Sequence, residues 1–128
     1  NPNTMRLLLL ASVAFLVSCT PLQPGGGSMA VEAFEERLDD AGAQLLDVRT
    51  AGEFSSGHLA HARNLDWTSG QLEAAVPELD KSKPVLLYCA SGRRSDAARQ
   101  FLVTQGFTDV VDLEGGIGAW SSAGKPVE

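Results

Sequence analysis

The sequence is poor in cysteine, and this argues against several kinds of site. It contains two cysteines in 128 residues, Cys19 and Cys89, which lie 70 positions apart. A pair so distant is no disulfide framework, and neither cysteine belongs to a Cys-x-x-Cys pair or to a Cys/His pattern with zinc spacing. His58 and His61 are three apart but have no third ligand nearby. We therefore expect no disulfide scaffold and no metal site.

Basic residues and long apolar runs are also scarce. The chain has 10 Lys and Arg against 16 Asp and Glu, so its formal net charge is −6. A chain with this balance has no general positive field, and we expect no nucleic-acid partner. The N-terminal apolar run, residues 7–17, is too short to span a bilayer easily. The length and the 44% apolar content fit one globular domain.

The N-terminal segment has the features of a secretory signal. Met5 and Arg6 precede the apolar run, which has the length of a signal-peptide core. The run ends in LVSC, whose last residue is Cys19, and this resembles the lipobox of bacterial lipoproteins. The resemblance implies cleavage before Cys19, a lipid on Cys19, and, with Thr20 in place of Asp, the outer membrane. We expect a periplasmic protein whose only membrane attachment is this lipid.

Other interpretations of this region stay open. The signal could be cleaved without lipidation, or the segment could be a core element that precedes a cysteine by chance. The stretch PLQPGGGS, residues 21–28, predicts a flexible tether. Met29 follows it directly, and translation from Met29 would give a cytoplasmic protein. We divide the chain into a signal and tether over 1–28 and one domain over 29–128.

From residue 28 onward, helical and strand patterns alternate. Short apolar runs predict strands at 44–48, 62–65, 84–89 and 109–113. Helices are predicted from Ser28 as N-cap, and over 50–58, 69–79, 95–105 and 115–123. Such alternation is typical of an α/β fold in which helices cover both faces of a parallel sheet.

The residues around Cys89 predict a reactive thiol. Cys89 ends the fully apolar strand PVLLYC, and in open α/β sheets ligands sit beyond the carboxyl ends of strands. Small residues after it let backbone N–H groups turn inward as an anion-binding nest, and a helix N-terminus follows. Such surroundings lower a thiol pKa from ~8.5 to roughly 3.5–7.5. The candidate binding residues are Ala90, Ser91, Gly92, Arg93, Arg94 and Ser95, the two arginines adding positive charge.

Three stretches together identify a family. LLDVRTAGEFSSGHLAHARNL resembles the first signature of the rhodanese-like domains, YCASGRRSDAA their active-site loop, and GFTDVVDLEGGIGAW their C-terminal signature. They occur in family order and cover about residues 29–124. The resemblance implies a five-stranded parallel sheet and a cysteine, here Cys89, that carries sulfane sulfur as a persulfide.

The resemblance also assigns supporting residues. Asp47, Arg49, Glu53, Gly57, His58 and Asn64 match the first signature, and Gly115, Gly116 and Trp120 match the last. We expect structural roles for most of them, including an ion pair between Arg49 and Glu53 and a backbone-bracing or catalytic role for Asp47. The family often has Pro and Gly where this chain has Ala60 and His61, so the local turn is not predicted.

The implied activity is sulfur transfer from thiosulfate, or another small anionic donor, to cyanide or a thiol, by two displacements at Cys89 and without metal or organic cofactor. We expect a monomer with ping-pong kinetics. One alternative is a carrier that receives persulfide from a protein partner. Another is a phosphatase of the same fold, which uses a Cys-x5-Arg loop; here Arg94 stands one place too early.

Overall fold

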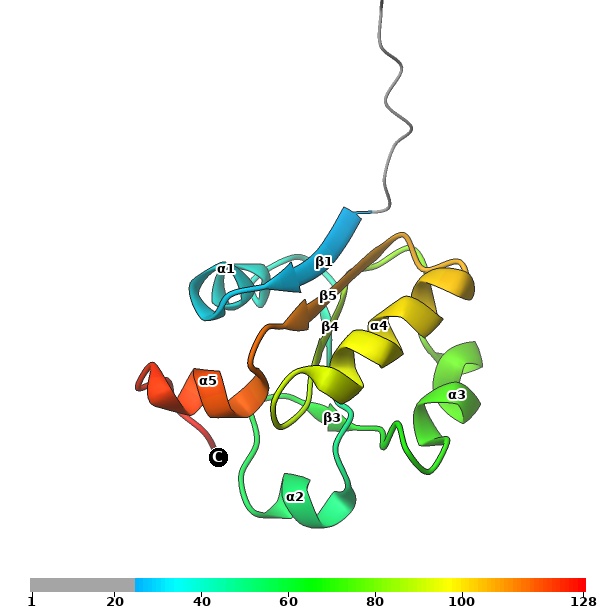
Figure 1. Cartoon of the computed structure of the whole chain (residues 1–128). Helices are drawn as coiled ribbons and strands as arrows, with labels where there is room; N and C mark the ends of the chain where they lie inside the picture. The colour runs from blue at the N-terminus through cyan, green and yellow to red at the C-terminus, as the bar shows by residue number, and fades with distance from the viewer. Residues whose placement is uncertain (1–24) are drawn as a thin grey trace, which may run out of the picture.

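A computed structural model describes residues 25–128 as an α/β domain around one parallel sheet (Figure 1). The sheet has five strands in the order β1-β5-β4-β2-β3, and every pair of neighbours is parallel. The strands are β1 (Gly25–Met29), β2 (Gln44–Asp47), β3 (Arg63–Asn64), β4 (Val85–Tyr88) and β5 (Asp109–Leu113). The helices are α1 (Val31–Arg37), α2 (Ala51–Ser55), α3 (Gln71–Ala75), α4 (Arg93–Thr104) and α5 (Gly116–Ser122), with a 3-10 turn η1 (Val76–Glu78).

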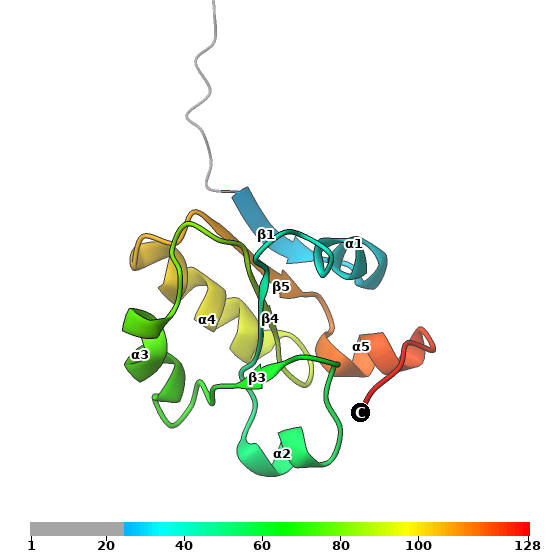
Figure 2. The same cartoon turned by 180° about the vertical axis from the view of Figure 1, so that it is seen from behind.

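Side-chain alternation along β4 divides the core into two layers. Val85 and Leu87 pack on the face covered by α3 and α4, whereas Leu86 and Tyr88 pack on the face covered by α1 and α5. All four are buried, as a central strand of a parallel sheet requires. The views from front and back show helices on both sides of the sheet (Figures 1 and 2). This confirms the predicted fold.

The prediction of a flexible tether is wrong for residues 25–28. They form most of β1, an edge strand paired with β5 from Gly25 to Met29. Ser28 is therefore not a helix cap; α1 follows Ala30 in extended conformation. Glycine weakens strands, but Gly26 lies so close to Val110 that a β-carbon would fall 2.0 Å from its carbonyl oxygen. The close pairing with β5 thus outweighs the low strand propensity of the three glycines.

The predicted signal, Cys19 and residues 21–24 of the tether lie outside the described residues. Within residues 25–128, no helix is long and apolar enough to cross a membrane.

Helix α4 starts two residues earlier than predicted and directs its N-terminus at the end of β4. Gly92, at φ 102°, is its N-cap, and this left-handed conformation favours glycine. Helix α2 lies beyond the carboxyl ends of the strands (Figure 1). The carboxyl edge of the sheet, the start of α4 and α2 therefore surround one region.

Candidate active site

Cys89 follows the last residue of β4 and is buried, with 1% of its surface exposed. It belongs to the core layer under α3 and α4. The backbone N–H of Gly92 donates a hydrogen bond to Cys89 Sγ at 3.1 Å. The loop thus turns back on the sulfur within three residues, as the pattern of small residues predicts.

Burial and hydrogen bonds act in opposite directions on Cys89. Burial raises the pKa of the thiol, but hydrogen bonds from the Ser95 hydroxyl and from the N–H groups of Ser95, Gly92 and Ser91 lower it, and the net pKa lies below its ordinary value. Donors directed at sulfur favour the charged form. The nest and the helix start therefore favour ionisation of Cys89.

Contacts with α5 orient this loop. The N–H groups of Ile117 and Gly118 donate to the carbonyl oxygens of Cys89 and Ala90, at 2.9 and 3.2 Å. The first turn of a helix has such free N–H groups. In a trans peptide the N–H points away from the C=O. Holding these two carbonyls at α5 therefore turns the N–H groups that follow them to the opposite side of the loop. The Gly-Gly pair of the third signature is thus explained: the backbone of Gly116 meets that of the loop directly.

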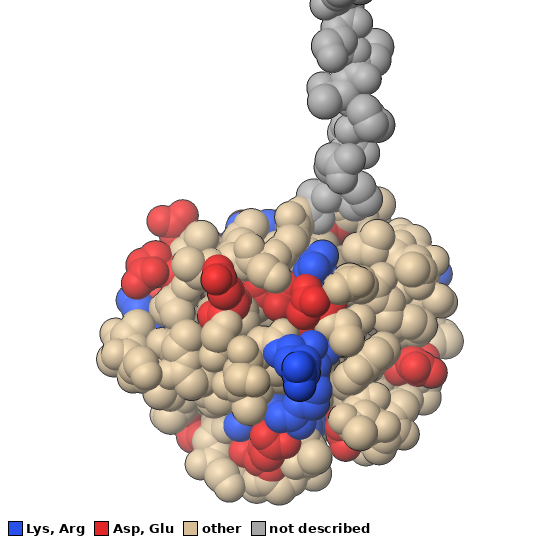
Figure 3. All heavy atoms as spheres, viewed as in Figure 1, with Lys and Arg blue, Asp and Glu red and all other residues tan. Residues whose placement is uncertain are grey.

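The two arginines of the loop differ in what they contact. Arg93 is exposed, whereas Arg94 makes a two-pronged ion pair with Glu53 of α2, at 2.8 and 2.9 Å. The pair lowers the pKa of Glu53 to about 2, chiefly through the Arg94 hydrogen bond. The pKa of Arg94 is raised mainly by Glu53 and also by the charge of Cys89. Basic atoms gather over the start of α4 with acidic atoms beside them (Figure 3).

The predicted ion pair between Arg49 and Glu53 is wrong. Arg49 precedes Thr50, the N-cap of α2, so the two side chains do not share a helix face. Arg49 Nη2 instead pairs with Asp47 at 2.7 Å and donates to the carbonyl of Gly57 at 2.6 Å. Asp47 and Arg49 are both buried.

Asp47 lies on the opposite sheet face from Cys89. It is in register with Tyr88 of β4, whose ring packs under α1 and α5. Asp47 accepts hydrogen bonds from the backbone and side chain of Arg49, and the Tyr88 hydroxyl accepts one from the N–H of Leu59 at 3.0 Å. Of the two roles considered for Asp47, its position fits bracing of the backbone.

The remaining signature residues hold the loops after β2. His58 stacks on Phe54 with ring centroids 3.8 Å apart, and Asn64 donates to the carbonyls of Asp47 and Arg49. Trp120 is buried under the sheet, and its indole N–H donates to the Pro126 carbonyl at 2.9 Å. Among residues 25–128, no three His, Cys, Asp or Glu side chains form a cluster that could hold a metal ion.

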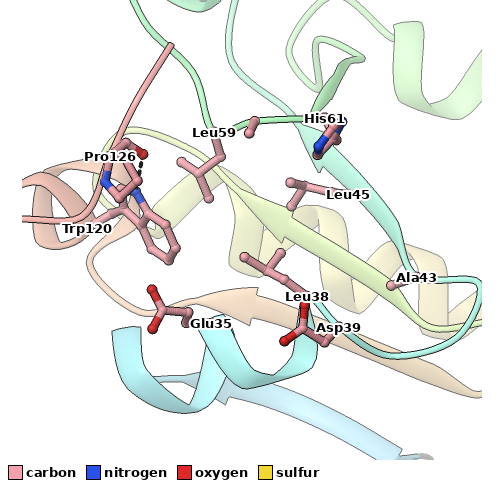
Figure 4. Close-up of a pocket in the computed structure, with 10 residues that line it drawn as sticks. Glu35, Leu38, Asp39, Ala43, Leu45, Leu59, His61, Trp120 and Pro126 are labelled. Carbon is pink, nitrogen blue, oxygen red and sulfur yellow. Dashed lines mark hydrogen bonds between the residues drawn. The ribbon is translucent and has the colours of Figure 1, made fainter.

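The departure from the family pattern at His61 has a structural counterpart. His61 is exposed and adopts φ 68°, the left-handed conformation that favours glycine. It also lines a pocket of about 370 Å³ with Leu45, Leu59 and Trp120 (Figure 4). This pocket lies on the α1/α5 face, away from Cys89.

Asp112 is a buried polar residue beside the site that the sequence did not predict. This residue of β5 is 1% exposed, and its carboxylate faces Ser95, Arg99 and Ser28. An aspartate inside the otherwise apolar strand VVDL was the available signal, since a buried charge needs partners.

The structure thus defines an α/β domain with a buried thiol at the carboxyl edge of its parallel sheet and a loop N–H group directed at the sulfur. The chain belongs to the rhodanese-like domain family, whose model matches residues 30–123. It is 32% identical over 95 residues to the thiosulfate sulfurtransferase GlpE of Shewanella oneidensis, covering 74% of this chain and 92% of that one.

Solved structures share the fold. The rhodanese-related protein of Thermoplasma volcanium has a TM-score of 0.70 at 33% identity, over 79% of this chain and 96% of that one. Protein RPA3614 of Rhodopseudomonas palustris, described as a possible tyrosine phosphatase, has a TM-score of 0.67 at 26% identity, over 79% and 83%.

Proposed function

We propose that this protein is a sulfurtransferase that moves sulfane sulfur from thiosulfate, or a related anionic donor, to cyanide or a thiol. The observation that carries the proposal is the loop around Cys89, whose N–H groups and Ser95 hydroxyl favour a thiolate. The homologous GlpE protein supports thiosulfate as donor.

The chemistry needs only groups of this chain. The Cys89 thiolate attacks the outer sulfur of thiosulfate, the sulfur–sulfur bond breaks, and sulfite leaves with the electron pair. The same N–H groups then hold the persulfide. A thiolate or cyanide attacks the outer sulfur, and the electron pair of the broken bond returns to Cys89 as thiolate. Two displacements of this kind give ping-pong kinetics.

The phosphatase alternative fits the site less well. A phosphoryl group needs a longer loop and a guanidinium that faces its oxygens in two-pronged fashion. Arg94 stands five positions after Cys89 and already gives both prongs to Glu53. We therefore favour transfer of a single sulfur atom over phosphoryl transfer.

One pair of assays on the full chain tests this proposal. We expect saturable turnover with thiosulfate and cyanide that is lost in Cys89→Ser, and no hydrolysis of an aryl phosphate by either protein. Hydrolysis of the phosphate without sulfur transfer would reverse the assignment. Persulfide uptake from a persulfidated protein alone, without turnover of thiosulfate, would identify a carrier instead.

The proposed location is the periplasmic face of a membrane, with a lipid on Cys19. Five residues separate Cys19 from Gly25, the start of β1, and a fully extended chain of that length reaches roughly 20 Å. A lipid on Cys19 would thus keep the amino edge of β1 close to the bilayer, and the Cys89 loop lies at the other edge of the sheet. Mass analysis of native protein for a lipid on Cys19 tests this.

A further inference from the structure

Residues 125–128 follow α5 and contact three other parts of the domain; we call them the strap. At its start, Lys125 pairs with Glu35 of α1 at 3.1 Å. The indole N–H of Trp120, in α5, donates to the Pro126 carbonyl at 2.9 Å (Figure 4). The other end of the strap lies beside the loop that follows α2 (Figures 1 and 2). The strap therefore joins α1 and α5 to that loop.

The end of the strap pairs with His58 through the backbone. The N–H of His58 donates to the Glu128 carbonyl at 3.1 Å, and the N–H of Glu128 donates to the His58 carbonyl at 2.8 Å. Two reciprocal bonds of this kind are those of an antiparallel pair. The His58 ring stacks on Phe54, and its Nδ1 lies 3.0 Å from the Phe54 carbonyl. Because Phe54 belongs to α2, the strap reaches this helix through one residue.

Helix α2 has few contacts of its own. It has five residues, none of which is buried, so burial of apolar surface contributes little to its position. After the helix, the Gly57 carbonyl accepts a hydrogen bond from Arg49 at 2.6 Å. Segments with few buried contacts open most readily in a folded protein. The contacts at the two ends of α2 therefore determine how often it moves.

Glu53 connects α2 to the loop around the sulfur. Its carboxylate accepts two hydrogen bonds from Arg94, at 2.8 and 2.9 Å. Arg94 lies in the first turn of α4, directly after the loop whose Gly92 N–H donates to Cys89 Sγ. A guanidinium that binds a carboxylate with two prongs fixes the orientation of both groups. Movement of α2 thus reaches the loop through a single ion pair.

We propose that the strap positions α2 against the Cys89 loop, and that Trp120 is the positioning residue that holds the strap. With the strap in place, Glu53 stays bonded to Arg94, and Cys89 stays covered, with 1% of its surface exposed. When the strap leaves His58, α2 moves away more often and a reagent reaches the thiol. This role concerns access to Cys89 whatever the thiol reacts with, so it does not depend on the proposed sulfur transfer.

The first test is amide hydrogen exchange of the full chain. Glu128→Pro removes the N–H that donates to His58, and Trp120→Phe removes the donor to Pro126 while keeping an aromatic ring. Loss of a neutral hydrogen bond changes an opening equilibrium by roughly three- to tenfold. We expect exchange in α2 to rise by that factor in both variants, with exchange in α4 and β4 unchanged. Glu128→Gln, which keeps the backbone N–H, is the matched control and should exchange as wild type.

Alkylation shows whether α2 covers the thiol. On the plateau of the pH profile Cys89 is fully ionised, so its rate with iodoacetamide measures access alone. We expect Glu128→Pro to raise this rate by about threefold or more, and Glu53→Gln, which weakens the bond to Arg94, to raise it as well. Because the strap acts through Glu53, about half or more of the Glu128→Pro effect should be lost in the Glu53→Gln background.

A strap that stabilises only its own surroundings would give a different result. Exchange would rise at His58 and in the strap, but the α2 amides and the Cys89 rate would stay at wild-type values, and this overturns the proposal. An equal rise in α2, α4 and β4, or an equal effect of Glu128→Gln and Glu128→Pro, also overturns it. If Glu128→Pro does not fold, Trp120→Phe decides between these outcomes. Sulfur-transfer assays separate the two hypotheses, because a wild type that lacks turnover but shows these responses would reject only the proposed function.

Discussion

Gly116 lies against the Cys89 carbonyl so closely that a β-carbon on Gly116 would fall 2.5 Å from that oxygen. Gly116 also adopts φ 60°. Two elements distant in sequence, the loop after β4 and the start of α5, thus meet backbone to backbone. This contact fixes the carbonyls of Cys89 and Ala90 at the start of α5, and with them the orientation of the loop around the sulfur.

Gly116→Ala should therefore lower the free energy of unfolding and make Cys89 less reactive towards alkylation. A β-carbon meets backbone atoms, which cannot rotate away, and a left-handed alanine adds strain, so the free energy of unfolding should fall by about 2 kcal/mol or more. Urea unfolding and alkylation of Cys89 at neutral pH measure the two effects. Gly118→Ala is the matched control, because its β-carbon would lie 3.4 Å from the Ala90 carbonyl at ordinary φ. Equal effects of both substitutions would contradict this explanation.

Glu53 should make the free energy of unfolding depend on pH in the acid range. Its pKa in the folded protein is about 2, against an ordinary 4.5, so its contribution is present above pH 4.5 and is lost as the pH falls towards 2. The Glu53 side chain is 35% exposed, and solvent screening limits the contribution to about 1 kcal/mol. Urea unfolding of wild type and Glu53→Gln between these pH values measures it. The two curves should converge at the acid end, whereas exposed Glu73, changed to Gln, should leave the profile of the wild type unaltered.

Replacing Arg49 should lower the free energy of unfolding far more than replacing an exposed arginine. Arg49→Ala leaves Asp47 charged, buried and without its ionic partner, which costs about 3–5 kcal/mol. Arg63→Ala, which removes an exposed ion pair with Glu78, should cost about 1 kcal/mol or less. Thermal or urea unfolding of the two variants gives the comparison. Similar losses for both would show that the buried pair does not brace β2 and its loop.

His61→Gly should stabilise the protein. The exposed side chain is held at φ 68°, and glycine relieves that strain while adding freedom to the unfolded chain. The first effect outweighs the second by roughly 0.5 kcal/mol. His61→Ala, which keeps the β-carbon, is the control and should show no gain in urea unfolding. A loss of stability in the glycine variant would mean that the imidazole itself contributes.

The sequence predicted the strands and helices whose apolar side chains recur at strand or helix spacing. Strands β2, β4 and β5 are apolar runs, and helices were found at α2, α4 and α5 near their true ends. Strand β1 was missed because GGGS has no apolar side chain to show a strand, and its only support is the edge of β5. Such long-range pairing cannot be read from local residues.

The site was predicted in the same uneven way. The thiol and its loop follow from a local arrangement of strand, small residues and helix, but the partner of each charged residue depends on the fold. Spacing suggested Arg49 with Glu53, although the capping box formed by Thr50 and Glu53 already indicated that Arg49 lies outside the helix. The pairing of Glu53 with Arg94 joins residues 41 positions apart.

The most direct test is the intact mass of the full chain after incubation with thiosulfate. We predict a gain of one sulfur atom, located on the Cys89 peptide, removed by cyanide, and absent in Cys89→Ser. A mass that stays unchanged while the protein remains folded, or an added sulfur that persists in Cys89→Ser, would contradict the central claim that this loop prepares Cys89 to carry sulfur.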